Sequence, residues 1–67
     1  MTTRPEVRMG NDIARQFAHL SHDRATAAIA GHLHMFWEPR MIRALRGAVA
    51  AGDDDVDPLL RDAAAKL

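Results

Sequence analysis

Apolar residues recur along this chain at the three- and four-residue spacing of amphipathic helices. Met9, Ile13, Phe17 and Leu20 keep this spacing, and we predict a first helix over residues 4–19. The predicted second helix, which ends near residue 36 or 37, has a stripe made of Ala25, Ala28, Ile29, His32, Leu33 and Phe36. The third stripe comprises Met41, Ile42, Leu45, Ala48 and Val49, and a short fourth one comprises Leu59, Leu60, Ala63, Ala64 and Leu67.

Residues that begin helices precede the first two segments. Thr3-Arg4-Pro5-Glu6 has the form of a capping box, and Ser21 or Asp23 can cap the second helix. Gly10 lies inside the first helix, where it costs about 1 kcal/mol relative to Ala. We expect the close approach of a neighbouring backbone to account for this glycine.

Prolines and a glycine mark the remaining boundaries. Pro39 and Pro58 suit the first turn of a third and a fourth helix, and Asp57 can cap the fourth. Gly52 is a natural stop for the third helix. No apolar–polar alternation is long enough for a strand. The chain is therefore predicted to be one all-α domain over residues 1–67, a small bundle of three helices plus a short C-terminal helix.

The composition indicates a thin hydrophobic core. Of 67 residues 48% are hydrophobic, but 13 of these are Ala, which buries little area. A chain of this length is marginally stable on its own. It contains no Cys, so disulfides and thiolate metal sites are excluded. Very regular packing, self-association or a larger partner must supply the missing stability.

The net charge is zero but unevenly distributed. Residues 1–50 carry seven Arg against four acidic residues, a balance of +3, and residues 51–67 carry the compensating −3. Without a basic excess, we expect neither nucleic acid nor a membrane surface as the partner. There is no apolar run of about 20 residues and no signal-peptide pattern, so the expected location is the cytoplasm.

The polar residues do not form a convincing metal or catalytic site. His32 and His34 are two residues apart and diverge on a helix, and the first helix is predicted to end between His19 and His22. The acidic run 53–57 reads as a solvated turn. We expect His32 to be half-buried and bonded to a carbonyl or an acid, with a partner-facing role as the alternative.

The segment His32–Met41 is the most informative stretch. Adjacent helical side chains point about 100° apart, so a small bundle cannot easily bury both Phe36 and Trp37. Phe36 follows the apolar stripe and is expected in the core, whereas Trp37 is a candidate for burial against a partner. Trp and Arg often dominate binding energy, and Arg40 lies close by. The predicted partner-binding residues are His32, Trp37, Pro39, Arg40, Met41 and Arg43.

The same residues resemble the delta subunit of soluble, NAD-dependent, molybdenum- or tungsten-containing formate dehydrogenases. The resemblance rests on Met9-Gly-Asn-Asp-Ile13 with Phe17, on His32-Leu33 with the run Phe36–Met41, and on Asp57–Arg61 with Ala63 and Leu67. The Phe-Trp-x-Pro-Arg-Met run is the most specific part. Ile42 departs from the pattern, because a basic residue is expected after the Met. Arg43 is the candidate to supply that charge.

The resemblance implies a non-catalytic accessory subunit that brings no cofactor. In such enzymes the alpha subunit holds molybdopterin with Mo or W and oxidises formate, and other subunits carry iron–sulfur clusters, FMN and NAD. The implied partner is the catalytic alpha subunit. Self-association of the isolated chain stays open as an alternative.

Two other functions stay open at this point. One is a transient chaperone that holds the apo-enzyme during cofactor insertion. The other is a small helical DNA-binding regulator that uses Arg40, Arg43 and Arg46.

Overall fold

The computed structural model describes residues 4–67, and the elements within them are all helical. The helices are α1 (Pro5–Gln16), α2 (His22–Phe36), α3 (Pro39–Ala50) and α4 (Pro58–Ala64). The predicted all-α class and the number of helices are confirmed. α1 ends earlier than predicted, because the Phe17 N–H bonds to the carbonyls of Ala14 and Arg15 and begins a turn. The predicted capping box includes Thr3, which lies outside the described residues.

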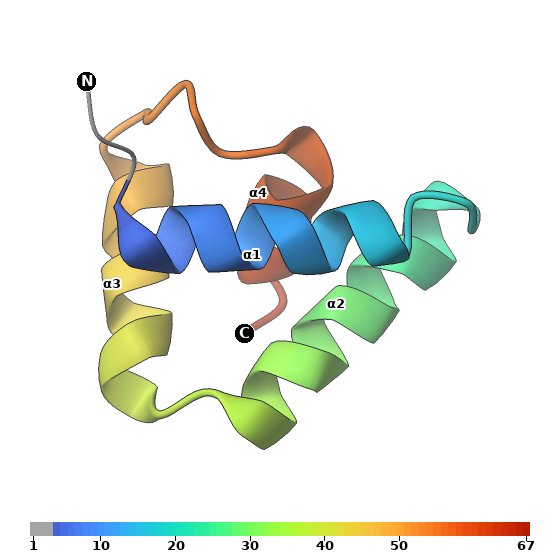
Figure 1. The fold of residues 1–67 in the computed structure, drawn as a ribbon, viewed down its shortest axis with the longest axis horizontal. Helices are drawn as coiled ribbons and strands as arrows, with labels where there is room; N and C mark the ends of the chain where they lie inside the picture. Colours follow the sequence, from blue (N-terminus) through green and yellow to red (C-terminus); the bar gives the residue numbers. More distant parts are fainter. Residues whose placement is uncertain (1–3) are drawn as a thin grey trace.

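The helices α1, α2 and α3 are arranged around α4 (Figure 1). α2 and α3 diverge from a corner at residues 37–38, α4 lies between them, and α1 crosses in front. α4 contacts each of the other three helices, whereas the consecutive helices α2 and α3 barely touch each other. The short C-terminal helix is therefore the centre of the packing. The described chain measures 30 × 23 × 17 Å.

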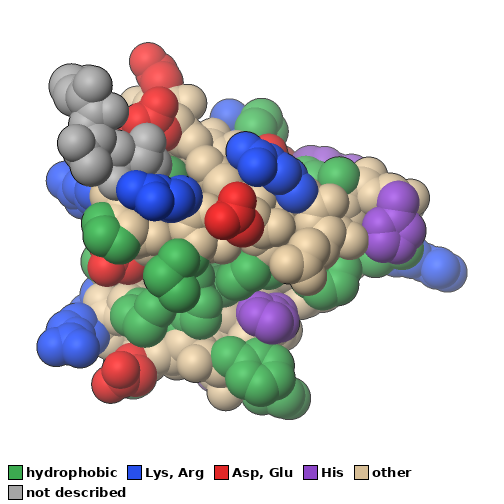
Figure 2. Space-filling view, in the orientation of Figure 1, with side chains coloured by type: hydrophobic (Ala, Val, Ile, Leu, Met, Phe, Trp, Pro, Cys, Tyr) green, Lys and Arg blue, Asp and Glu red, His purple; other side chains and the backbone are tan. Residues whose placement is uncertain are grey.

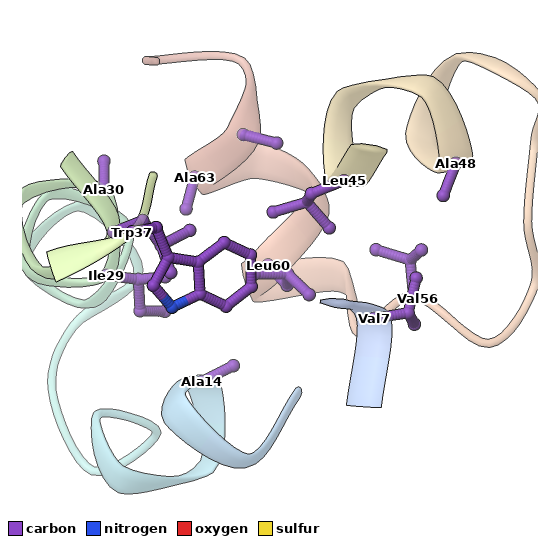
Figure 3. Packing of buried hydrophobic residues seen from close by; sticks show 12 residues of the cluster. Val7, Ala14, Ile29, Ala30, Trp37, Leu45, Ala48, Val56, Leu60 and Ala63 are labelled. Atoms are coloured by element: carbon purple, nitrogen blue, oxygen red, sulfur yellow. The ribbon is translucent and has the colours of Figure 1, made fainter. Parts of the chain in front are cut away.

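Small side chains let the helices approach closely around a few larger ones. Ile29, Leu33, Leu45 and Leu60 are fully buried. Figure 3 shows Ile29, Leu45 and Leu60 together with alanines from every helix, and Leu33 belongs to the same cluster. The alanines of this cluster are Ala14, Ala30, Ala48, Ala63 and Ala64. Such a core has few large side chains, so each of them carries much of the buried area.

Three predicted helix boundaries are confirmed at the level of hydrogen bonds. The Ser21 Oγ accepts from the Arg24 N–H at 3.4 Å, and the Asp57 Oδ1 accepts from the Leu59 N–H at 2.8 Å. Gly52 has a φ of +75°, and its N–H bonds to the Val49 carbonyl at 3.0 Å. The following N–H, of Asp53, reaches the Ala48 carbonyl at 3.1 Å. These two bonds form the Schellman motif that a glycine permits at the end of α3.

Gly10 is buried at the crossing of α1 and α4, and the expectation for it needs a correction. The group that approaches it is the side chain of Leu60, not a neighbouring backbone.

No helix among residues 4–67 combines the length and apolar character that crossing a bilayer requires.

Candidate interaction surface at the corner between two helices

The corner between α2 and α3 is a tight connection with several backbone hydrogen bonds. Trp37 and Glu38 have extended backbones, with φ/ψ of −94°/143° and −71°/150°. Pro39 explains this geometry, since a proline disfavours helical conformation in the residue before it. The Trp37 N–H still bonds to the Leu33 carbonyl at 2.9 Å, and the Glu38 carbonyl accepts from the N–H groups of Met41 and Ile42 at 2.9 and 3.2 Å.

Trp37 is buried within its own chain, which corrects the expectation that its ring is packed by a partner. Its side chain is only 8% exposed and belongs to the core cluster. Figure 3 shows the indole within this cluster, with Ile29, Leu60 and Ala63 around it. The backbone at Trp37 is extended, so the direction of its side chain does not follow the helical periodicity of α2. The indole fills space that alanines leave open in the core.

Phe36 is exposed, which corrects the expectation that it lies in the core. It lies 67% exposed, and Met35 beside it lies 76% exposed. Phe36 does share the helical face of Ile29. However, α2 has 15 residues and its main packing partner α4 has seven, which correspond to lengths of about 22 and 10 Å. The C-terminal end of α2 therefore projects past the core, as Figure 1 shows.

His32 packs against Phe36 on this projecting end. The ring centroids are 4.8 Å apart and the ring planes are tilted by 42°. His32 is half-buried, as expected. Within residues 4–67 it makes no hydrogen bond to a carbonyl or an acid, so the expected polar partner is wrong. Instead, the imidazole ring of His32 contacts the phenyl ring of Phe36 and limits its orientations.

The predicted arginines lie on the outer side of α3. Arg40, Arg43 and Arg46 are exposed, and they form no ion pair within the described part of the chain. Arg40 and Arg43 lie opposite the buried face that carries Leu45 and Ala48. Pro39 is exposed, whereas Met41 is half-buried and packs against the core.

Figure 2 shows one face of the molecule, on which hydrophobic and charged side chains lie next to one another. Hydrophobic side chains gather below α1, over the region between α2 and α3, and reach the end of α2. Arg or Lys side chains lie at the edge of this region on the α3 side, with Asp or Glu side chains beside them. We call Met35, Phe36, Arg40 and Arg43 the corner surface.

Sequence reasoning missed a polar contact between α1 and the acidic loop. The Asn11 Nδ2 donates to the Asp55 carbonyl at 2.7 Å, and the Asn11 Oδ1 accepts from the Asp57 N–H at 2.9 Å. The loop is also bonded internally, because the Asp53 Oδ1 accepts from the Asp55 N–H at 2.9 Å. The predicted solvated turn is thus tied down, and Asn11 acts as a clamp. Its place in the Met9–Ile13 motif was the available signal.

Three titratable residues outside the corner form pairs at the surface near the start of α2. His22 Nε2 lies 2.9 Å from Asp62 Oδ2, and Arg61 Nε lies 3.3 Å from Asp62 Oδ1. The His22–Asp62 pair joins the start of α2 to α4, whereas Arg61 and Asp62 are neighbours within α4. Across residues 4–67, no three His, Asp or Glu side chains gather closely enough to hold a metal ion. A hollow of about 390 Å³ lies open to solvent beside the acidic loop and is lined in part by Asp53, Asp54 and Arg61.

Comparison with known proteins identifies the family. Residues 7–64 match the model of the family described as the NADH-dependent formate dehydrogenase delta subunit, FdsD. The chain belongs to the FdsD family. The matched range contains the Asn11 clamp, the whole corner surface and α4 to its end. No curated protein and no solved structure matches the chain.

Proposed function

We propose that this FdsD chain is a non-catalytic accessory subunit that binds the catalytic alpha subunit of a formate dehydrogenase and stabilises the assembled enzyme. The family match over residues 7–64 is the observation that carries the proposal. Binding to the folded partner alone raises the population of that folded state by mass action, and it needs no chemistry from this chain.

The distribution of polar groups supports a binding role. The acidic side chains of the described residues lie exposed or half-buried, mostly in surface pairs and turns. General acid–base catalysis typically uses groups whose pKa is shifted by desolvation or crowding. Following the family resemblance, we also propose that the molybdopterin, iron–sulfur, FMN and NAD chemistry belongs to the other subunits of the enzyme, and that the complex acts in the cytoplasm.

The test is purification of the active enzyme from a source that produces this chain with an affinity tag. We expect the chain to co-elute with active enzyme at a fixed ratio. Enzyme from a source that lacks the chain should show a shorter thermal half-life or less assembled complex, with unchanged turnover per assembled enzyme. A chain found only on the cofactor-free form would favour the transient chaperone. A chain that is absent from both forms and does not affect assembly contradicts the proposal.

A further inference from the structure

The corner surface has an apolar part that is exposed to water in the isolated chain, which is unfavourable. Met35 and Phe36 are adjacent, and they are the two most exposed large hydrophobic residues described. Contiguous exposed apolar groups bordered by polar ones are typical of interaction sites. Phe and Met are also enriched in the buried centres of protein interfaces.

The backbone that carries this surface is held by packing and hydrogen bonds within the chain. Trp37 is buried directly beside Phe36, and Pro39 begins α3 two residues later. The bond from the Trp37 N–H to the Leu33 carbonyl fixes the end of α2, and His32 restricts the phenyl ring. Little backbone freedom therefore remains to be lost on binding, which favours affinity.

The charge beside the apolar pair is net positive, with two exposed arginines against one exposed acidic residue, Glu38. Arg40 and Arg43 are one helical turn apart on the outer side of α3, and neither forms an ion pair within residues 4–67. Glu38 is the only acidic residue between Asp23 and Asp53. A carboxylate-bearing partner would complement this charge and orient the contact.

We propose that Met35 and Phe36 enter an apolar pocket of the catalytic subunit whose rim carries Asp or Glu side chains that pair with Arg40 and Arg43. This inference rests on the proposed function and specifies its surface. A second copy of the chain fits less well. A two-fold interface centred on Phe36 presents the same patch from both sides and brings the arginines of both copies together. Like charges across an interface oppose association.

The test measures binding of the full chain to formate dehydrogenase purified without its delta subunit. Phe36→Ala should weaken binding by about tenfold or more, because a central aromatic residue often dominates an interface. Phe36→Leu should restore part of the affinity. Arg40→Glu with Arg43→Glu should weaken binding and abolish most of its dependence on salt. Arg24→Glu is the matched control, since Arg24 is exposed at the opposite end of α2 and should not matter.

The outcomes separate this inference from the proposed function. If the Phe36 and the Arg variants bind the enzyme as well as the unmodified chain does, the proposed role of the corner surface is contradicted. The proposed accessory function is then unaffected. If only the Phe36 variant weakens binding, the acidic rim is overturned. If the unmodified chain does not bind, the proposed function itself falls. Loss of dimers in the Phe36→Ala variant, with enzyme binding unchanged, would assign the surface to a second copy instead. Circular dichroism verifies that each variant is folded.

Discussion

The α1 backbone at Gly10 lies directly against the Leu60 side chain of α4. A Cβ atom at Gly10 would approach Cδ2 of Leu60 to 2.7 Å and Cδ1 to 3.0 Å. Leu60 is fully buried at the centre of the cluster, so its methyl groups have little room to move. This contact explains a glycine in the middle of a helix and sets the distance between α1 and the central helix.

Gly10→Ala is expected to destabilise the fold despite the better helix propensity of Ala. Overpacking a core costs about 1–3 kcal/mol, and the propensity gain of about 1 kcal/mol offsets part of it. We expect a net loss of up to about 2 kcal/mol in urea unfolding. The loss should shrink or reverse in the Leu60→Val background, which lacks the approaching Cδ atoms. An equal effect in both backgrounds would mean that the Gly10–Leu60 contact is not the cause.

Gly31→Ala and Gly47→Ala should do the opposite and stabilise the protein. Both glycines lie inside helices, are exposed, and have no atom within 4 Å of an added Cβ. Only the propensity term then remains, and it favours Ala by up to about 1 kcal/mol at each site. The two gains should add, because the sites lie on different helices. Thermal unfolding of the two single variants and the double variant checks this, and a destabilised variant would contradict it.

Most of the helix boundaries could be predicted because their signals are local. The cap at Ser21, the first-turn prolines Pro39 and Pro58, and the stop at Gly52 each act on hydrogen bonds within a few residues. Such signals are complete in the sequence itself. The end of α1 was harder, because the turn that follows Gln16 continues the apolar spacing to Leu20.

The burial of Phe36 and Trp37 could not be predicted in the same way. Helical periodicity places Phe36 on the same face of α2 as the buried residues, and this is correct. Burial also depends on how far the neighbouring helix extends. Trp37 leaves the helix, so periodicity gives no direction for its ring. The Asn11 clamp joins residues 44 and 46 positions apart, and only the packed arrangement brings them together.

Trp37→Ala should be far more harmful to folding than Phe36→Ala. Truncating a buried Trp costs about 3–5 kcal/mol, which is a large part of the total stability expected for a small domain. Truncating an exposed side chain usually changes stability by no more than about 0.5 kcal/mol. Circular dichroism during urea unfolding measures both variants. In the unmodified chain, fluorescence of the single Trp should be blue-shifted and shift to the red on unfolding. Equal costs for the two substitutions would contradict the assignment of Trp37 to the core.

Asn11→Ala should loosen the acidic loop from α1. It removes the partners of the Asp55 carbonyl and the Asp57 N–H, and leaving a partly buried group unsatisfied costs about 1–3 kcal/mol. Asn11→Asp keeps an acceptor for the Asp57 N–H, but it loses the donor and adds a negative charge next to the acidic run 53–57. The Asp variant should therefore regain stability as salt is added, whereas the Ala variant should respond to salt like the unmodified chain. Hydrogen exchange of the Asp57 amide, compared with that of the Gly52 amide in the separate Schellman motif, localises the effect. Unchanged protection of the Asp57 amide in both variants would show that the clamp does not hold the loop.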